Sequence, residues 1–404
     1  MRLIISFTAL FLSVALLQLS SGAIGPLDVL SGLQEGFTTT QVGTLGSAHF
    51  AGFFVGCWWA PRLMGGVGHN RAFAAFAALG VIGALGHTLF IDPLGWAALR
   101  LMTGLSIAGC YTVVEAWLQA KVTNETRGRV LGVYRLVDLG AALISQLMIA
   151  VLEPASYISY NILAILCCAS VLPLMLTKIK APPAAKAPRL RPWKVVKLSP
   201  LAAAGVIVAG VTTPAFRMVG PIYGQEVGLR PDQIGLFLAA AVLGGALAQI
   251  PAGWLADRYD RRYVLVGVSI AAAVVSTSIT QLGTGSQSLI FAASFLFGLV
   301  SFPVFSISAA HANDFATPKQ AVEVSASLLF LYGLGAIAAP LLGSALIARF
   351  GPGGLFAMIT AAHLSLIAFS LIRMRARATS ATRTRYSYVP RTSFLVGRLL
   401  GRRR

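Results

Sequence analysis

Among the charged side chains within otherwise largely apolar stretches of the sequence, four are the main candidates for chemistry. They are two arginines, Arg100 and Arg217, and two carboxylates, Glu115 and Asp138. An ionisable group near the middle of a lipid-spanning helix costs about 2.5–3.5 kcal/mol on insertion scales, so its presence favours a functional role. The chemistry open to this set is recognition of a charged ligand and the binding and release of a proton.

The two arginines are candidates for contact with an anion. Arg100 lies about two turns, or roughly 10 Å, from the outer end of its stretch. It could hold an anionic substrate group or stabilise the ionised form of a coupling carboxylate, or it could only donate hydrogen bonds to neighbouring helices. Arg217 follows a sequence around Pro214 that is typical of a bent helix, and it could meet an anionic substrate or extend to the membrane interface.

The two carboxylates are candidates for proton transfer. Asp138 lies near the middle of its stretch, where removal from water makes a carboxylate bind a proton more readily. Arg135, three residues earlier on the same helix face, would oppose this by pairing with it. Glu115 lies closer to the inner end of its stretch, and it could serve transport or act as a gate that pairs with Arg127 or Arg129.

Neutral polar side chains within the stretches form a second group. Gln18 and Gln146 are the preferred candidates for lining a substrate cavity, although amides in this setting commonly serve only to link helices by hydrogen bonds. The sequence contains no nucleotide-binding loop, no hydrolase motif and no metal-binding or redox spacing of Cys and His. It therefore indicates no enzyme, no metal and no cofactor.

The elements that must position these side chains are membrane-spanning helices. The chain of 404 residues is 56% hydrophobic and 11% charged, whereas soluble domains carry about 25% charged residues. A helix needs roughly 20 apolar residues to cross a bilayer, and the sequence offers twelve such stretches. They are expected near residues 3–25, 38–60, 72–91, 93–119, 128–151, 156–177, 199–222, 234–254, 263–281, 286–309, 322–347 and 352–372.

The longest polar gap separates the sixth and seventh stretches and divides the chain into halves. It is rich in Pro, Lys and Arg, which is typical of a linker, and it covers residues 178–198. The sequence therefore predicts one six-helix bundle at 1–177, a second at 199–373 and a basic cytoplasmic tail at 374–404. The tail is expected to rest loosely on the membrane surface and to play no part in transport.

Positive charge is concentrated on one side of the expected topology. With the N-terminus inside, 27 of the 32 Lys and Arg residues fall in inner segments and only two in outer loops. Cytoplasmic loops are the ones enriched in Lys and Arg, so both termini are expected in the cytoplasm. The same distribution accounts for the net charge of +19 without a nucleic-acid partner, because the basic residues lie on no soluble domain.

A charged motif follows the eighth stretch. Residues Gly253–Arg262 read GWLADRYDRR, which resembles the cytoplasmic signature of the major facilitator superfamily, G-x-L-A-D-R-x-G-R-R. Arg100–Gly104 fits the R-x-x-x-G signature of that superfamily, and Arg127–Gly128 fits the R-G that commonly opens its fifth span. In the corresponding loop of the first half, Ala60 stands where the acid would be.

A narrower resemblance is carried by four short segments. They are similar to the YcaD-type branch of bacterial facilitators, and they lie at Val114–Leu118, Asn124–Tyr134, Ala310–Asp314 and Leu331–Gly335. This resemblance indicates no particular substrate.

The charged motif is expected to act as a conformational latch on the cytoplasmic side. Gly253 would let a neighbouring helix approach, and Asp257 would pair with arginines or face the positive end of another helix. Such contacts would hold the cytoplasmic side shut and break when it opens. The complete predicted latch is Gly253, Asp257, Arg258, Arg261, Arg262, Arg127 and Asp314.

The resemblance implies an all-α membrane protein with twelve transmembrane helices in two pseudo-symmetric six-helix bundles, the major facilitator fold. We expect a monomer of the bacterial inner membrane that moves a small molecule by rocking the bundles about a midplane site. A proton gradient or the substrate's own gradient would drive it. The alternative is a transporter-like sensor or scaffold without transport, which the missing acid at Ala60 favours and the intact motif around Asp257 disfavours.

Overall fold

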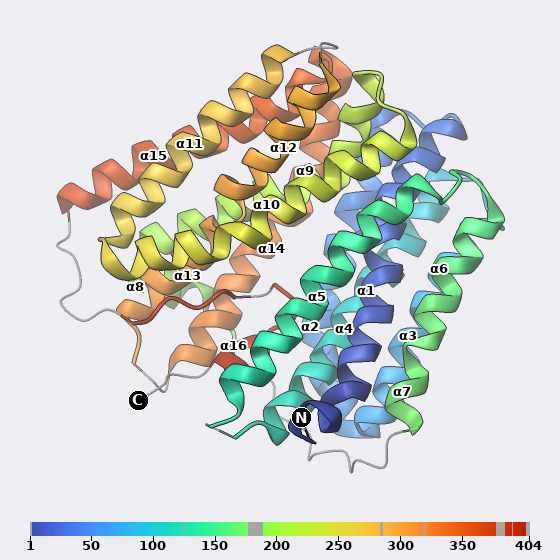
Figure 1. Cartoon of the computed structure of the whole chain (residues 1–404), viewed down its shortest axis with the longest axis horizontal. Coiled ribbons are helices and arrows are strands. Elements are labelled where there is room, and N and C mark those ends of the chain that lie inside the picture. The colour runs from blue at the N-terminus through green and yellow to red at the C-terminus, as the bar shows by residue number, and fades with distance from the viewer. Residues whose placement is uncertain are drawn as a thin grey trace. The chain divides into compact units, whose positions relative to one another are not determined.

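The computed structural model describes residues 2–123, 125–176, 189–282, 286–317, 320–376, 384–389 and 391–400. Within these ranges every regular element is a helix (Figure 1). The chain forms two compact units. Unit 1 holds Met1–Arg189 with Pro390–Arg404, and unit 2 holds Leu190–Val389. The all-helical fold expected from the apolar stretches is confirmed.

Unit 1 is built from the first six spans. Its helices are α1 (Arg2–Gln34), α2 (Thr39–Val67), α3 (His69–Gly86), α4 (Pro93–Lys121), α5 (Arg127–Leu147), α6 (Tyr157–Ala169), α7 (Val171–Leu176) and α16 (Val396–Leu400). The fifth span continues into a short 3₁₀ helix, η1 (Met148–Ala150), and α6 and α7 together make the sixth span.

Unit 2 is built from the remaining spans. Its helices are α8 (Pro192–Leu198), α9 (Pro200–Glu226), α10 (Pro231–Arg258), α11 (Arg261–Leu282), α12 (Gln287–Ser301), α13 (Val304–Asp314), α14 (Ala321–Phe350) and α15 (Gly353–Ala376). Helices α12 and α13 make one span that is interrupted at Pro303, because proline lacks the N–H that would continue the helical hydrogen bonds.

Ten helical segments of the described chain are long and apolar enough to cross a membrane. Helices α2 and α3 are the two expected spans that fall outside this set. Their ends carry polar side chains such as Arg62, His69 and Arg71. These side chains lower the mean hydropathy of both helices.

Two glycines allow α2 and α4 of unit 1 to pack backbone against backbone. A Cβ atom on Gly52 would lie 1.9 Å from the carbonyl oxygen of Leu101, and one on Gly104 would lie 1.9 Å from that of His49. Small residues are the usual means of close helix approach in membranes. Gly104 therefore has a packing role within the R-x-x-x-G signature.

The same close packing at glycines occurs in unit 2 between α10 and α12. A Cβ atom on Gly244 would lie 2.0 Å from the carbonyl oxygen of Phe295, and one on Gly298 would lie 1.9 Å from that of Ala241. In each unit the second and fourth spans are thus joined by a reciprocal pair of glycines. This internal repetition matches the pseudo-symmetry that the family resemblance implies.

Two sequence expectations about segment ends need correction. The first span was expected to end near residue 25, but α1 continues through Pro26 to Gln34. Prolines are tolerated inside membrane helices because neighbouring groups satisfy the freed carbonyls. Linker residues 178–188 lie outside the described residues, and the rest of the linker includes the short helix α8.

The basic tail also differs from the loose surface segment that was expected. Residues 377–383, 390 and 401–404 lie outside the described residues. Of the others, Ser393 is 0% exposed, and Leu395 belongs to the hydrophobic core of unit 1. Phe394 meets Phe54 edge-on, with ring centroids 6.1 Å apart. The tail packs inward because it contains a short apolar run among its arginines.

Candidate functional site

A buried ion pair links α1 and α4 in unit 1. Arg100 Nε lies 3.3 Å from Asp28 Oδ2, and both side chains are 1% exposed. Asp92 caps the start of α4 by accepting a hydrogen bond from Gly95 N at 2.6 Å, with Pro93 in the first turn. These residues set where α4 begins and therefore place Arg100 two turns into it. The arginine singled out from the sequence thus meets a carboxylate.

His87 approaches the same carboxylate from the end of α3. Its Nε2 lies 3.4 Å from Asp28 Oδ2, and its Nδ1 lies 2.6 Å from the carbonyl oxygen of Gly83. A carbonyl only accepts, so Nδ1 must carry a hydrogen, and a neutral ring would then present an unprotonated Nε2. Two acceptors would face each other. The contact is favourable only when a further proton lies on His87 or on Asp28.

Aromatic rings hold the imidazole in place. His87 stacks on Tyr160 with centroids 5.3 Å apart and an interplanar angle of 8°, and it meets the edge of Trp96 at 5.0 Å. The indole N–H of Trp96 donates to the carbonyl oxygen of Phe90 at 2.5 Å. His87, Trp96 and Tyr160 are all at most 2% exposed, so this shell both fixes the ring and excludes water from the ion pair.

A second polar cluster lies nearer the N-terminus of α1. The Tyr111 hydroxyl is 2.7 Å from Gln18 Oε1 and 2.5 Å from Asp138 Oδ1. One phenol hydrogen cannot serve two acceptors, so either Asp138 is protonated or the Gln18 amide is turned to donate. Gln18 precedes Asp28 by ten residues on the same helix, which separates the two clusters by about 15 Å.

Glu115 binds the C-terminal segment. The Tyr134 hydroxyl donates to Oε1 at 3.2 Å, and the hydroxyls of Thr392 and Ser393 donate to Oε1 and Oε2. The sequence suggested Arg127 or Arg129 as partners, but the hydrogen-bond donors to Glu115 are these three hydroxyls instead. Glu115 is 0% exposed, and neutral donors on both oxygens satisfy its carboxylate.

The other two predicted pathway residues are Gln146 in unit 1 and Arg217 in unit 2. Gln146 Nε2 donates to the carbonyl oxygen of Gly22 at 3.1 Å and to Ser145 Oγ at 3.1 Å. It therefore links α5 to α1, as amides in membrane helices commonly do. Arg217 is half-buried on α9 and belongs to unit 2.

In unit 2, Arg261 is the centre of the predicted latch. Its Nη1 lies 2.6 Å from Asp314 Oδ1, and its Nη2 lies 3.4 Å from Asp257 Oδ1. Arg261 and Asp314 are 1% and 4% exposed, whereas Asp257 is 44% exposed. The stronger pair is therefore Arg261–Asp314, and Asp257 contributes a weaker and more hydrated contact.

The C-terminal segment completes this cluster. Thr384 N donates to Asp314 Oδ1 at 2.8 Å, and its carbonyl oxygen accepts from Arg261. Tyr386 N donates to Asp257 Oδ1 at 2.6 Å. The Tyr386 ring also covers Gly253, where a Cβ atom would lie 2.8 Å from Cδ1. Gly253 thus admits the tail, where the sequence suggested a neighbouring helix.

The remaining latch residues make separate contacts. Arg262 pairs with Asp260, with Nη2 to Oδ2 at 2.7 Å. Asp260 stands where the family signature has glycine, and it thereby gains a partner within the same motif. The Arg258 guanidinium lies 5.3 Å from the centroid of the Trp254 ring. Arg127 begins α5 and belongs to unit 1.

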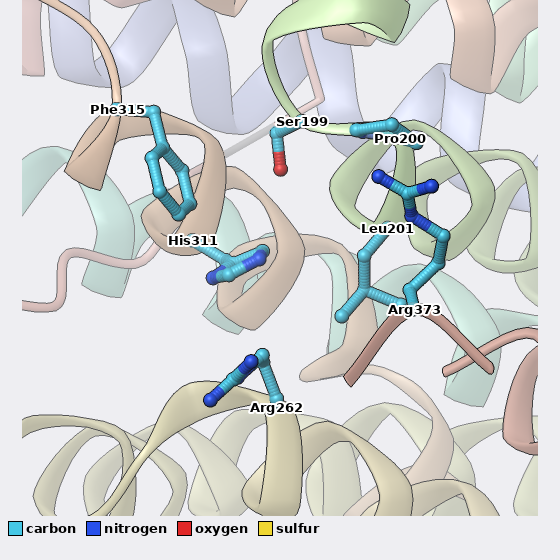
Figure 2. A pocket seen from close by; sticks show the side chains of 7 residues that line it. All are labelled: Ser199, Pro200, Leu201, Arg262, His311, Phe315 and Arg373. Carbon is cyan, nitrogen blue, oxygen red and sulfur yellow. The ribbon is translucent and has the colours of Figure 1, made fainter. Parts of the chain in front are cut away.

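A small cavity lies at the start of α9 in unit 2 (Figure 2). It has a volume of about 20 Å³, which is room for a water molecule. Its walls come from α9, α11, α13 and α15 and from the residues that flank α9 and α13. The lining residues are Ser199, Pro200, Leu201, Arg262, His311, Phe315 and Arg373.

Sequence reasoning missed the two residues that complete the Arg100 site. Asp28 falls three residues beyond the expected end of the first span, and His87 lies near the end of the third. A useful signal was present in both cases. Asp28 lies two residues after Gly25-Pro26, and His87 precedes a polar gap. With consecutive spans running in opposite directions, the ends of the first and third spans fall on the same side of the membrane as the start of the fourth, where Arg100 lies.

Comparison with known proteins agrees with this architecture. A protein-family model described as "Major Facilitator Superfamily" matches residues 204–400 of this chain. The MFS-type transporter YcaD of Shigella flexneri is 29% identical over 353 residues, covering 85% of this chain and 89% of that protein. An MFS-type transporter of Yersinia pestis (strain Pestoides F) is 27% identical over 354 residues, with 87% and 90% covered.

Solved transporter structures share the fold. The nucleoside transporter NupG superposes with a TM-score of 0.73 at 13% identity, covering 92% of this chain and 99% of that one. The D-xylose-proton symporter gives 0.69 at 14% identity, with 94% and 99% covered. The chain therefore shares the fold of these transporters, and it is similar in sequence to MFS-type transporters over most of its length.

Proposed function

We propose that the protein is a secondary active transporter that works by alternating access as a monomer and couples transport to protons. The observation that carries the proposal is the approach of His87 Nε2 to Asp28 Oδ2 at 3.4 Å, with the other ring nitrogen committed to a carbonyl. A hydrogen bond between these two acceptor atoms would need a further proton. Arg100, 3.3 Å from the same oxygen, favours the ionised carboxylate instead.

Competition between a proton and Arg100 gives the coupling step. When the carboxyl group of Asp28 is protonated, its attraction for Arg100 falls, and the guanidinium becomes available to an anionic group of the substrate. When the proton leaves, the ion pair between α1 and α4 forms again. The two states differ in a contact between helices, so a proton can bias the conformational equilibrium.

The second cluster extends this pathway along α1. Asp138 and Tyr111 offer a carboxyl and a hydroxyl group that can exchange a proton, and Gln18 can orient the hydroxyl. We assign proton transfer to Asp138 and not to Glu115. The carboxylate of Glu115 already accepts three hydrogen bonds from hydroxyl groups, and these favour its ionised form over the protonated one.

The orientation and division of the chain are part of the proposal. Both termini are placed in the cytoplasm of a bacterium by the excess of Lys and Arg in the inner segments. The bundles are proposed at residues 1–177 and 199–373. The contacts around Arg261 then lie on the cytoplasmic side, where they act as the latch.

A proton-release measurement tests the coupling site without a known substrate. Purified protein in weakly buffered detergent is shifted from pH 5 to pH 8, and the released protons are counted with a pH dye. Asp28→Asn is expected to release about one proton fewer than the parent, because it removes the shared site. The matched variant Glu35→Gln alters an exposed carboxylate just after the end of α1 and leaves that site intact. Equal release by the parent and Asp28→Asn would contradict proton coupling at this site.

Transport itself is tested in proteoliposomes that contain an internal pH dye. The first compounds to add are nucleosides and D-xylose, because structural neighbours are named as transporters of these substrates. Internal acidification that depends on the added compound and is lost in Asp28→Asn is the expected result for symport. Uptake without any pH change would support transport but contradict proton coupling.

The second candidate is a transporter-like sensor or scaffold. It is favoured by Ala60, which leaves the first-half loop without its acid, and by a tail whose hydroxyls bind Glu115. In that case, ligands would stabilise the purified protein, but no compound that binds would be accumulated by proteoliposomes. Binding without transport is thus the outcome that selects this alternative.

A further inference from the structure

The cavity at the start of α9 contains a buried hydroxyl group with no hydrogen-bond partner. Ser199 is 2% exposed, and its Oγ has no partner among the described residues. It lines the cavity together with side chains from other helices (Figure 2). A buried polar group left in this state destabilises the protein, because it has lost its hydrogen bonds to water without replacing them. A ligand that accepts a hydrogen bond from Ser199 would remove that destabilisation.

The same cavity faces the N-terminus of a long helix. Ser199 holds the N-cap position of α9 but makes no side-chain capping bond, and Pro200 follows it. Ala203 N donates to the Ser199 carbonyl at 3.1 Å, so the N–H groups of Leu201 and Ala202 precede the first helical hydrogen bond. Free N–H groups and the positive end of the helix dipole make such a terminus suitable for an anion.

Cationic side chains surround this terminus. Arg262 lines the cavity, but it is already paired with Asp260. Arg373, in the last turn of α15, lines it from another side and forms no ion pair with the described residues. His311 of α13 contributes a 7% exposed imidazole. The local charge is therefore positive, because only one of the two arginines has a carboxylate partner.

We propose that this cavity binds a phosphate group, supplied by an anionic lipid headgroup or by a soluble phosphate. The donors are the Ser199 hydroxyl, the first N–H groups of α9 and the Arg373 guanidinium. They approach from different helices, which suits a tetrahedral anion with several acceptor oxygens. The enclosed space holds about one water molecule. The phosphate therefore lies at its mouth, where the partly exposed Arg373 can turn toward it.

Two probes separate the possible sources of phosphate. The first is inorganic phosphate, titrated into protein in neutral detergent at constant ionic strength, with thermal stability as the readout. The second is phosphatidylglycerol, compared with phosphatidylcholine of the same acyl chains, with retained lipid measured by native mass spectrometry. Saturable stabilisation by phosphate identifies a soluble anion, and selective retention of phosphatidylglycerol identifies a headgroup. Either result supports the site.

The variants assign binding to this cavity. Arg373→Gln is expected to weaken the interaction about tenfold, the loss of about one charge-assisted contact. Arg375→Gln is the matched control, because Arg375 is exposed on the same helix and does not line the cavity. It should change binding less than about twofold. Ser199→Ala should weaken binding about three- to tenfold, since it removes a single neutral donor.

Two results would overturn the proposal. One is an equal effect of Arg373→Gln and Arg375→Gln, which would indicate general attraction to a basic surface. The other is a parent protein that shows no preference for phosphate over chloride and none for phosphatidylglycerol over phosphatidylcholine. Neither readout involves transport, so the site can fail while proton coupling holds, or hold while coupling fails.

Discussion

Replacing Asp28 by Asn is expected to destabilise the protein more than any other single change in the buried ion pair. The variant leaves Arg100 1% exposed with its carboxylate partner removed. A guanidinium cannot shed its charge in a protein. Removing one partner of a buried ion pair costs about 3–5 kcal/mol, because the remaining charge stays buried and uncompensated. We expect a loss in this range for Asp28→Asn.

Arg100→Gln should cost less, about 1–3 kcal/mol, because the group left behind can become neutral. Asp28 can take up a proton, and His87 lies 3.4 Å away to share it. The double variant Asp28→Asn with Arg100→Gln should be more stable than Asp28→Asn alone, because it also removes the buried charge of Arg100.

The assay is thermal unfolding in detergent, followed with a thiol-reactive dye. Cys57, Cys110 and Cys167 are buried and react only on unfolding, whereas Cys168 is exposed and contributes a constant baseline. An Asp28→Asn variant that is no less stable than Arg100→Gln would contradict a cost from the buried Arg100 charge. Stability losses of the two single variants that simply add in the double variant would also contradict it, because additivity would mean that the two side chains do not interact.

Three further outcomes follow from packing and charge. Gly104→Ala should lower the unfolding temperature, because its Cβ atom would lie 1.9 Å from a carbonyl oxygen of α2. Gly132→Ala, with open space at that position, should be neutral or raise stability by up to about 1 kcal/mol. Asp314→Asn should cost about 3–5 kcal/mol and Asp257→Asn about 0–1 kcal/mol, because only the first carboxylate is buried; equal losses in the same assay would contradict this. Leu395→Ala should cost about 2–5 kcal/mol of stability, because Leu395 belongs to the hydrophobic core of unit 1. An unchanged unfolding midpoint would instead support the loosely bound tail expected from the sequence.

Much of the fold could be predicted from the sequence because lipid imposes simple rules. Backbone groups must be satisfied within each span, so long apolar runs indicate helices without any knowledge of tertiary structure. The ends of the runs were harder to place. Helices α1 and α2 extend seven or more residues past the expected limits of residues 25 and 60. Proline and polar residues ended the predicted runs at these places, but neither ends a membrane helix by itself.

The site was predictable to the extent that its members are isolated charges in apolar runs. Arg100 could be found in this way, whereas Asp28 could not, because the predicted end of the first span left it in a loop. Contacts with the tail were beyond sequence reasoning. Glu115 and Ser393 are 278 positions apart, and no helical period or motif relates them. The tail was predicted to be a polar surface segment because it contains many arginines.

The two units use their buried charges in different ways. In unit 2 the arginine of the signature, Arg261, contacts two carboxylates and the backbone of Ala310. Its charge is thus compensated without any proton, and this arrangement suits a mechanical contact that is either made or broken. In unit 1 a single carboxylate, Asp28, is shared by an arginine and a histidine. In the proposed mechanism, Arg100 is the favoured partner of the ionised carboxylate and His87 is the favoured partner when a proton is shared, so protonation would decide which contact dominates. We infer that unit 1 senses the proton and that the signature contacts of unit 2 respond to the conformation it selects.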